Sequence, residues 1–91
     1  MYTLIKGEKR HIAMEVSRRS SQEFVIDVAT YDVEGIQSGT CEMDQEQKIV
    51  YFLIDTANEG FIKGNKYIAE FTVTIVGMEK IIKGKVVVHI T

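Results

Sequence analysis

Proline and tryptophan are absent from this 91-residue chain, cysteine occurs once, and long apolar runs are missing. Without proline or low-complexity stretches, no segment has the composition of an interdomain linker. The single cysteine, Cys41, excludes an internal disulfide and is expected to be a small buried hydrophobic residue. No run approaches the ~18–20 apolar residues that span a bilayer, so we expect no membrane partner.

Leucine and alanine are also scarce: together they number 6, against 22 valines and isoleucines. Because β-branched side chains lose rotamer freedom in a helix and fit a pleated sheet, a helical bundle is nearly excluded. Apolar residues make up 45% of the chain and charged residues 26%, which is typical of a globular protein. A chain of this length amounts to one domain, residues 1–91.

Short segments in which apolar and polar residues alternate follow one another along the chain, separated by glycines and polar clusters. The clearest alternation covers residues 66–76, and another covers residues 11–17. Seven such segments at turn spacings of about 8–12 residues predict an all-β fold, a single immunoglobulin-like antiparallel β-sandwich of about seven strands. The predicted core consists of Ile12, Met14, Val16, Phe24, Ile26, Val28, Tyr31, Val50, Phe52, Ile54, Tyr67, Ala69, Phe71, Val73, Ile75, Val86 and Val88.

Four local features refine this prediction. The apolar face changes parity near Val28–Ala29, which indicates a β-bulge. Residues 36–43 contain a glycine and predict a weaker strand at a sheet edge. Gly84, between two lysines of the last strand, indicates a second bulge. Tyr67 starts a late strand, so we expect its ring in the core and its hydroxyl bonded to nearby backbone, as in a tyrosine corner.

The net charge of −2 implies no general attraction to nucleic acid, but the charges are unevenly distributed. Residues 21–60 carry one basic and nine acidic groups, whereas both flanking segments are net basic. Antiparallel strands can bring such segments together as ordinary cross-strand ion pairs. Alternatively, the acidic surface docks on a basic surface of a protein partner or of a second copy, making a homo-oligomer. The candidate interface is either the edge strand 36–43 or the acidic face around it, with the carboxylates Asp32, Glu34, Glu42, Asp44 and Glu46.

Chemical motifs are scarce. Clustered carboxylates can hold a cation such as calcium, but the dense Asp-x-Asp-x-Asp spacing is missing, so a solvated acidic hairpin explains the pattern better. His11 and His89 lie far apart in the sequence and lack metal-ligand spacing. Neither Cys41 nor a serine stands in a recognisable nucleophile arrangement with a histidine. We therefore expect no cofactor and no enzymatic activity.

The order of the terminal segments is similar to that in one known family. The chain begins with TLIKGE at residues 3–8 and the alternating HIAMEVS at residues 11–17; it ends with GNKYIAEFTV at residues 64–73, a hairpin and KGKVVVHI at residues 83–90. This order resembles the immunoglobulin-like domain at the start of tailed-phage baseplate upper proteins and related prophage structural proteins. The resemblance implies a phage-derived, non-enzymatic assembly module and supplies no catalytic residues.

The sequence therefore favours a structural or assembly module of phage or prophage type that acts through protein–protein contacts. The alternative is a small adhesion or carbohydrate-binding sandwich, which needs an exposed aromatic platform formed by Tyr2, Tyr51 and Phe61. The first twelve residues lack the basic start and unbroken apolar stretch of a secretory signal. We therefore expect a protein that is cytoplasmic as synthesised and, under the first interpretation, is later incorporated into a phage particle.

Overall fold

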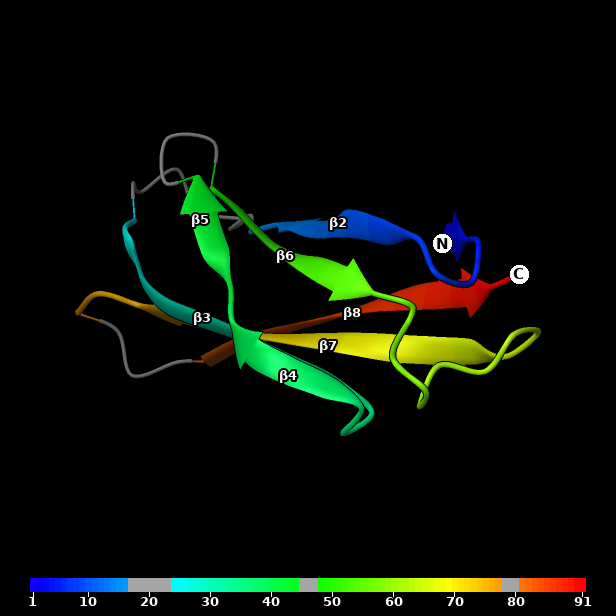
Figure 1. Ribbon diagram of the computed structural model, residues 1–91. Helices are drawn as coiled ribbons and strands as arrows, with labels where there is room; N and C mark the ends of the chain where they lie inside the picture. Colours follow the sequence, from blue (N-terminus) through cyan, green and yellow to red (C-terminus); the bar gives the residue numbers. More distant parts are fainter. Residues whose placement is uncertain (17–23, 45–47, 78–80) are drawn as a thin grey trace.

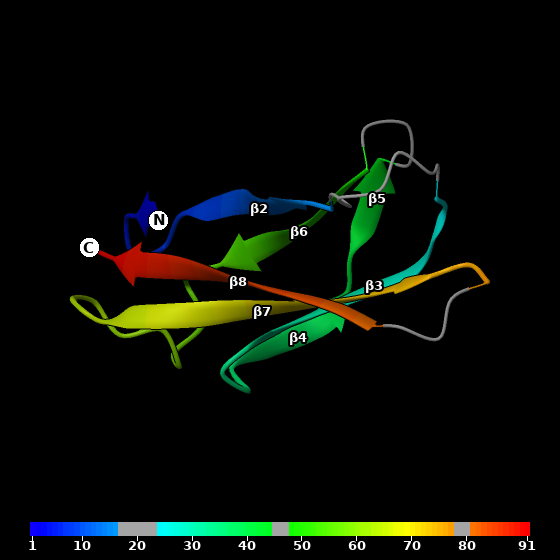
Figure 2. The same ribbon diagram turned by 180° about the vertical axis from the view of Figure 1, so that it is seen from behind.

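Segments rich in β-branched residues form extended strands throughout the described chain, residues 1–16, 24–44, 48–77 and 81–91 of the computed structural model. Eight strands in these residues form two sheets that lie one above the other (Figures 1 and 2). None of the described residues belongs to a helix that could cross a membrane. The strands are β1 (Tyr2–Leu4), β2 (Lys9–Glu15), β3 (Ile26–Val33), β4 (Gln37–Thr40), β5 (Glu42–Asp44), β6 (Ile49–Asp55), β7 (Lys66–Ile75) and β8 (Ile81–Ile90).

The strand order is that of an immunoglobulin-like sandwich. One sheet has the order β1-β8-β7-β3-β4 and the other has the order β2-β6-β5. In immunoglobulin lettering, β8-β7-β3-β4 correspond to strands G-F-C-C′ and β2-β6-β5 to strands B-E-D. The neighbouring strands are antiparallel except β1, which pairs with β8 in parallel. The predicted all-β sandwich is confirmed, with this one parallel pair as an addition.

The eighth strand arises because the chain changes sheets within the segment 36–43, which was predicted as one strand. The first part, β4, pairs with β3 at the edge of the five-stranded sheet, and the second part, β5, pairs with β6 in the opposite sheet. Cys41 lies at the change of sheet, where it is buried and donates its backbone N–H to the carbonyl oxygen of Ala29 at 2.8 Å. The edge position is confirmed for both halves.

The alternation predicted for residues 66–76 is confirmed: the odd-numbered side chains of β7 are buried, and Phe71 is 0% exposed. The predicted bulge in β3 is present, but its register shift lies between Ile26 and Val28. The shift turns Val28 outward, so the prediction of Val28 as a core residue is wrong: its side chain is 45% exposed. Four predicted core residues are only partly buried, Met14, Phe24, Tyr31 and Val86, while Leu4, Val33, Phe61 and Ile90 join the core.

Gly84 does not form the predicted bulge. It pairs with Phe71 in an unbroken register between β7 and β8. A Cβ atom at this position would overlap the sulfur of Met14, which reaches across from β2 in the opposite sheet. Glycine is therefore needed here because a side chain of one sheet packs directly on the backbone of the other.

Tyr67 has the predicted role of a tyrosine corner. Its hydroxyl donates a hydrogen bond to the carbonyl oxygen of Gly60 at 3.2 Å and accepts one from the Ile62 N–H at 2.7 Å. Its ring lies edge-to-face with that of Phe61, with centroids 5.3 Å apart. These contacts tie the connection after β6 to the start of β7. Ala69, two residues later, is buried where antibody domains have their second cysteine.

Candidate functional site

The predicted acidic interface begins at the turn between β3 and β4. Glu34 and Gly35 both have positive φ angles, 50° and 76°, as a tight hairpin turn requires. Asp32 stabilises this turn by accepting the Gly35 N–H through Oδ1 at 3.0 Å. Glu34 reaches across to β7, where its Oε2 accepts the Ile68 N–H at 2.7 Å. Both carboxylates therefore hold backbone groups of the five-stranded sheet near the β3–β4 turn.

The remaining acidic residues lie elsewhere. Glu42 and Asp44 belong to β5 in the three-stranded sheet, and Glu46 lies outside the described residues. The β3–β4 turn and β5 lie toward opposite ends of the sandwich in both views (Figures 1 and 2). The carboxylates therefore do not gather at one hairpin. Among the described residues, no group of three or more His, Cys, Asp or Glu side chains could hold a metal ion.

The strand β4 is an exposed edge. Ser38, Gly39 and Thr40 are all exposed, and no charged residue lies between Gln37 and Thr40. Because the Cys41 N–H bonds to β3 and hydrogen-bonding pairs alternate in an antiparallel ladder, Ser38 and Thr40 turn their N–H and C=O groups away from β3. A sixth strand added beside β4 could use these groups.

The other edges of the sandwich are protected. At one side, the Tyr2 hydroxyl bonds to both the N–H and the carbonyl oxygen of Ala13, at 3.2 and 3.4 Å, and so covers the outer edge of β2. The strands β1 and β5 contain three residues each, too few for a long template, and β5 carries two carboxylates. Among the edge strands that the structure describes, β4 is thus the exposed one that is longer than three residues and carries no charge.

The side chain of Gln37 closes the opposite side of the sandwich, a role that the sequence analysis missed. Its amide nitrogen donates to the Leu53 carbonyl oxygen at 2.8 Å and to the Tyr31 hydroxyl at 3.1 Å, and its oxygen accepts the Asp55 N–H at 3.0 Å. Beyond the end of β5, the Gln37 amide thus bonds to the backbone of β6 as a peptide group of a neighbouring strand would. No pattern in the sequence distinguishes this glutamine from a solvated one.

The potential catalytic side chains are kept apart by the fold. His11 is on the outer face of β2, edge-to-face with Tyr51 at 5.5 Å between centroids. His89 lies on β8, in the other sheet. Cys41 is 4% exposed, and burial raises the pKa of its thiol from 9.0 to about 11. The thiol is therefore protonated and shielded, which makes it a poor nucleophile.

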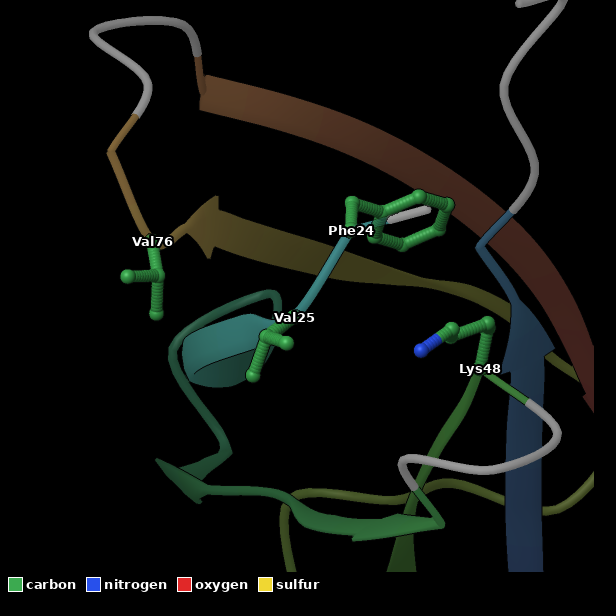
Figure 3. Close-up of a pocket in the computed structure, with 4 residues that line it drawn as sticks. All are labelled: Phe24, Val25, Lys48 and Val76. Carbon is green, nitrogen blue, oxygen red and sulfur yellow. The ribbon is translucent and has the colours of Figure 1, made fainter. Parts of the chain in front are cut away.

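A cavity of about 280 Å³ lies between the ends of several strands and is lined by Phe24, Val25, Lys48 and Val76 (Figure 3). The Lys48 ammonium lies 5.3 Å from the centroid of the Phe24 ring, within the range of a cation–π contact. A backbone hydrogen bond of 2.9 Å from the Val76 N–H to the Val25 carbonyl oxygen joins two of the lining residues. These four residues supply one cation and apolar walls; no spacing signal in the sequence marks them.

The aromatic residues required for a carbohydrate platform do not share an exposed face. Phe61 is 0% exposed. Tyr2 is half-buried with its hydroxyl on β2, and half-buried Tyr51 packs beside His11. The arrangement offers no continuous ring surface on which a sugar could stack.

Comparison of the chain with protein-family profiles, curated proteins and solved structures finds no match. The edges and faces of the sandwich are therefore the features from which a function can be inferred.

Proposed function

We propose that this chain is a non-enzymatic structural or assembly module of a phage or prophage virion, of the tail or baseplate type, that acts through protein–protein contacts. The observation that carries the proposal is the exposed, uncharged edge strand β4. The order of terminal sequence segments, which resembles the immunoglobulin-like domains of phage baseplate proteins, supplies the biological setting. In this setting the protein is made in the cytoplasm and is then incorporated into the particle.

An exposed edge is an assembly surface because a strand of another protein can extend the sheet through main-chain hydrogen bonds. Natural sandwiches usually protect such edges with charge, proline or short length. β4 has neither charge nor proline, since its residues are Gln37-Ser38-Gly39-Thr40. The carboxylates of Asp32 and Glu34 lie beside its first residues and would favour a partner with basic side chains.

The separation of His11, His89 and Cys41 supports binding rather than catalysis. Acid–base or nucleophilic chemistry needs two such groups within hydrogen-bond reach of one substrate atom. Here the histidines lie on different sheets, and the thiol is shielded between β4 and β5.

Site-specific photo-crosslinking tests the proposal in the native host. A photoreactive amino acid replaces Thr40 on β4, or Leu53 on the outer face of β6 as the matched control, and a DNA-damaging agent induces resident prophage. We expect Thr40 to crosslink to an identified virion protein and Leu53 to give no such product. A Ser38→Pro substitution, which removes an outward N–H without removing a β3 bond, should abolish the adduct. The absence of virion adducts at Thr40, with the chain outside purified particles, would contradict the proposal.

A further inference from the structure

The outer face of the five-stranded sheet carries exposed apolar side chains in two groups. Ile68 on β7 and Val87 on β8 are cross-strand neighbours and are 44% and 38% exposed. Ile81 and Val28 are 57% and 45% exposed and lie in one cross-strand row, on either side of Thr74. Each group forms a small contiguous apolar patch, and because such patches can mark interaction sites, this face is a candidate for docking.

The charges of this face are segregated about β7. Lys83 and Lys85 extend from β8 on one side, and Asp32 and Glu34 belong to β3 and its turn on the other. Glu70 on β7 lies between them, and its carboxylate is 3.6 Å from the Lys83 ammonium. The face is therefore basic along β8 and acidic at the end of β3, while β7 between them carries Lys66 at its start and Glu70 beside Lys83.

We propose that two copies of this chain dock through these faces about a two-fold axis that runs along β7. Such a rotation places β8 of each copy over β3 of the other. The register determines which residues meet: Lys85 and Asp32 lie in one row, so each Lys85 faces Asp32 of the second copy. In the same way, Ile81 faces Val28 of the second copy. An axis perpendicular to the strands would instead place β8 over β8 and so lysine on lysine. The axis along β7 brings like charges together only on β7 itself, where Lys66 and Glu70 face their own copies and each Glu70 lies 3.6 Å from a Lys83 ammonium, so the opposed charges of β8 and β3 favour this axis.

The dimer is a specific form of the assembly role proposed above and rests on it, but it uses a sheet face rather than the β4 edge. From strand spacing and rise, three strands of about ten residues present roughly 500 Å² per copy. A standard stable interface covers about 800 Å² per partner. We therefore expect a weak dimer whose affinity falls as salt screens the exposed ion pairs.

Sedimentation velocity over a concentration series, at low and high ionic strength, measures the association. We expect Lys85→Glu to weaken dimerisation about tenfold or more, because it turns two attractive contacts per dimer into repulsive ones. Asp32→Asn, which keeps an oxygen for the Gly35 N–H, should weaken it by a smaller factor. The control is Lys9→Glu on β2, which makes the same change in net charge on the other sheet and should leave association unchanged.

Zero-length carbodiimide coupling tests the orientation directly. It joins a carboxylate to an ammonium only when they are in contact, and mixing isotope-labelled with unlabelled chain shows which products join two copies. We expect a mixed-isotope product between Lys85 and Asp32. Lys85→Arg should still dimerise but lose this product, because the guanidinium keeps the charge and does not couple.

Two results would overturn the inference. One is a chain that stays monomeric throughout the concentration series at low salt. The other is equal weakening by Lys85→Glu and Lys9→Glu, which would make net charge the cause. Neither result affects the crosslinks expected from Thr40, and the loss of those crosslinks would leave the dimer measurement unaffected. The failure of one proposal is therefore distinguishable from the failure of the other.

Discussion

Replacing Tyr67 by phenylalanine removes one oxygen atom and keeps the ring that packs on Phe61. The lost hydroxyl donates to the Gly60 carbonyl oxygen and accepts from the Ile62 N–H, at 3.2 and 2.7 Å. Removing one partner of a buried hydrogen bond costs about 1–3 kcal/mol, because the other partner loses its bond and does not regain water. Since Tyr67 is 8% exposed, we expect Tyr67→Phe to lower the free energy of unfolding by about 2 kcal/mol.

Urea denaturation followed by circular dichroism measures this loss. We expect the midpoint to fall with an unchanged slope, because the folded core keeps its shape. For a domain of this size, each kcal/mol lowers the melting temperature by about 4–8 °C, so thermal melting should show a shift of roughly 8–16 °C. Tyr51→Phe, at a half-buried ring on the outer face of β6, is the matched control and should change little. Equal midpoints for the two variants would refute the assignment of Tyr67 as the corner.

Three further substitutions test other contacts. Gln37→Ala removes the amide that joins β4 to β6 and should cost about 1–3 kcal/mol in urea denaturation; an unchanged midpoint would contradict the closure by Gln37. Gly60→Ala should cost about 1–3 kcal/mol, because a Cβ there would lie 2.6 Å from Cγ2 of Ile36; the double variant with Ile36→Ala should cost less than the sum of the two single changes. Because the folded pKa of Cys41 is about 11 and its ordinary value is 9.0, the unfolded chain loses this proton first. As the pH rises from about 9 to 11, the free energy of unfolding should therefore fall by up to about 3 kcal/mol, and Cys41→Ala should remove this part of the decrease.

Period-two alternation was sufficient to predict most of the fold. In β7 one face is buried and the other is exposed, so the register of hydrophobic residues directly reports the direction of each side chain. The same logic identified a bulge in β3 from a change of parity. It misplaced Val28 because alternation shows that a bulge exists without fixing which residue is extra.

Contacts between the sheets could not be predicted in this way. The change of sheet at Cys41 and the packing of Met14 on Gly84 depend on which strands face one another, and alternation carries no information on that pairing. A glycine within a strand indicated a bulge, although the actual cause was a close approach from the opposite sheet. The candidate site shows the same limit, because Asp32 and Glu42 lie near each other in sequence but belong to different sheets.

The interior of this sandwich is packed with side chains, so binding must take place at its surface. The space between two packed sheets is only about 10 Å thick, and here it is filled by the side chains of both sheets. A binding surface must then be an edge, an outer face or an end of the sandwich.

Tyr2 covers the β2 edge and the Gln37 amide extends β5, so the sheets are closed to each other at both sides. The same closure leaves the outer hydrogen-bonding groups of β4 without a neighbouring strand in the described chain, and the face of β8, β7 and β3 without a covering layer. These two surfaces are perpendicular, so one copy could extend a sheet through β4 while pairing with a second copy through its outer face.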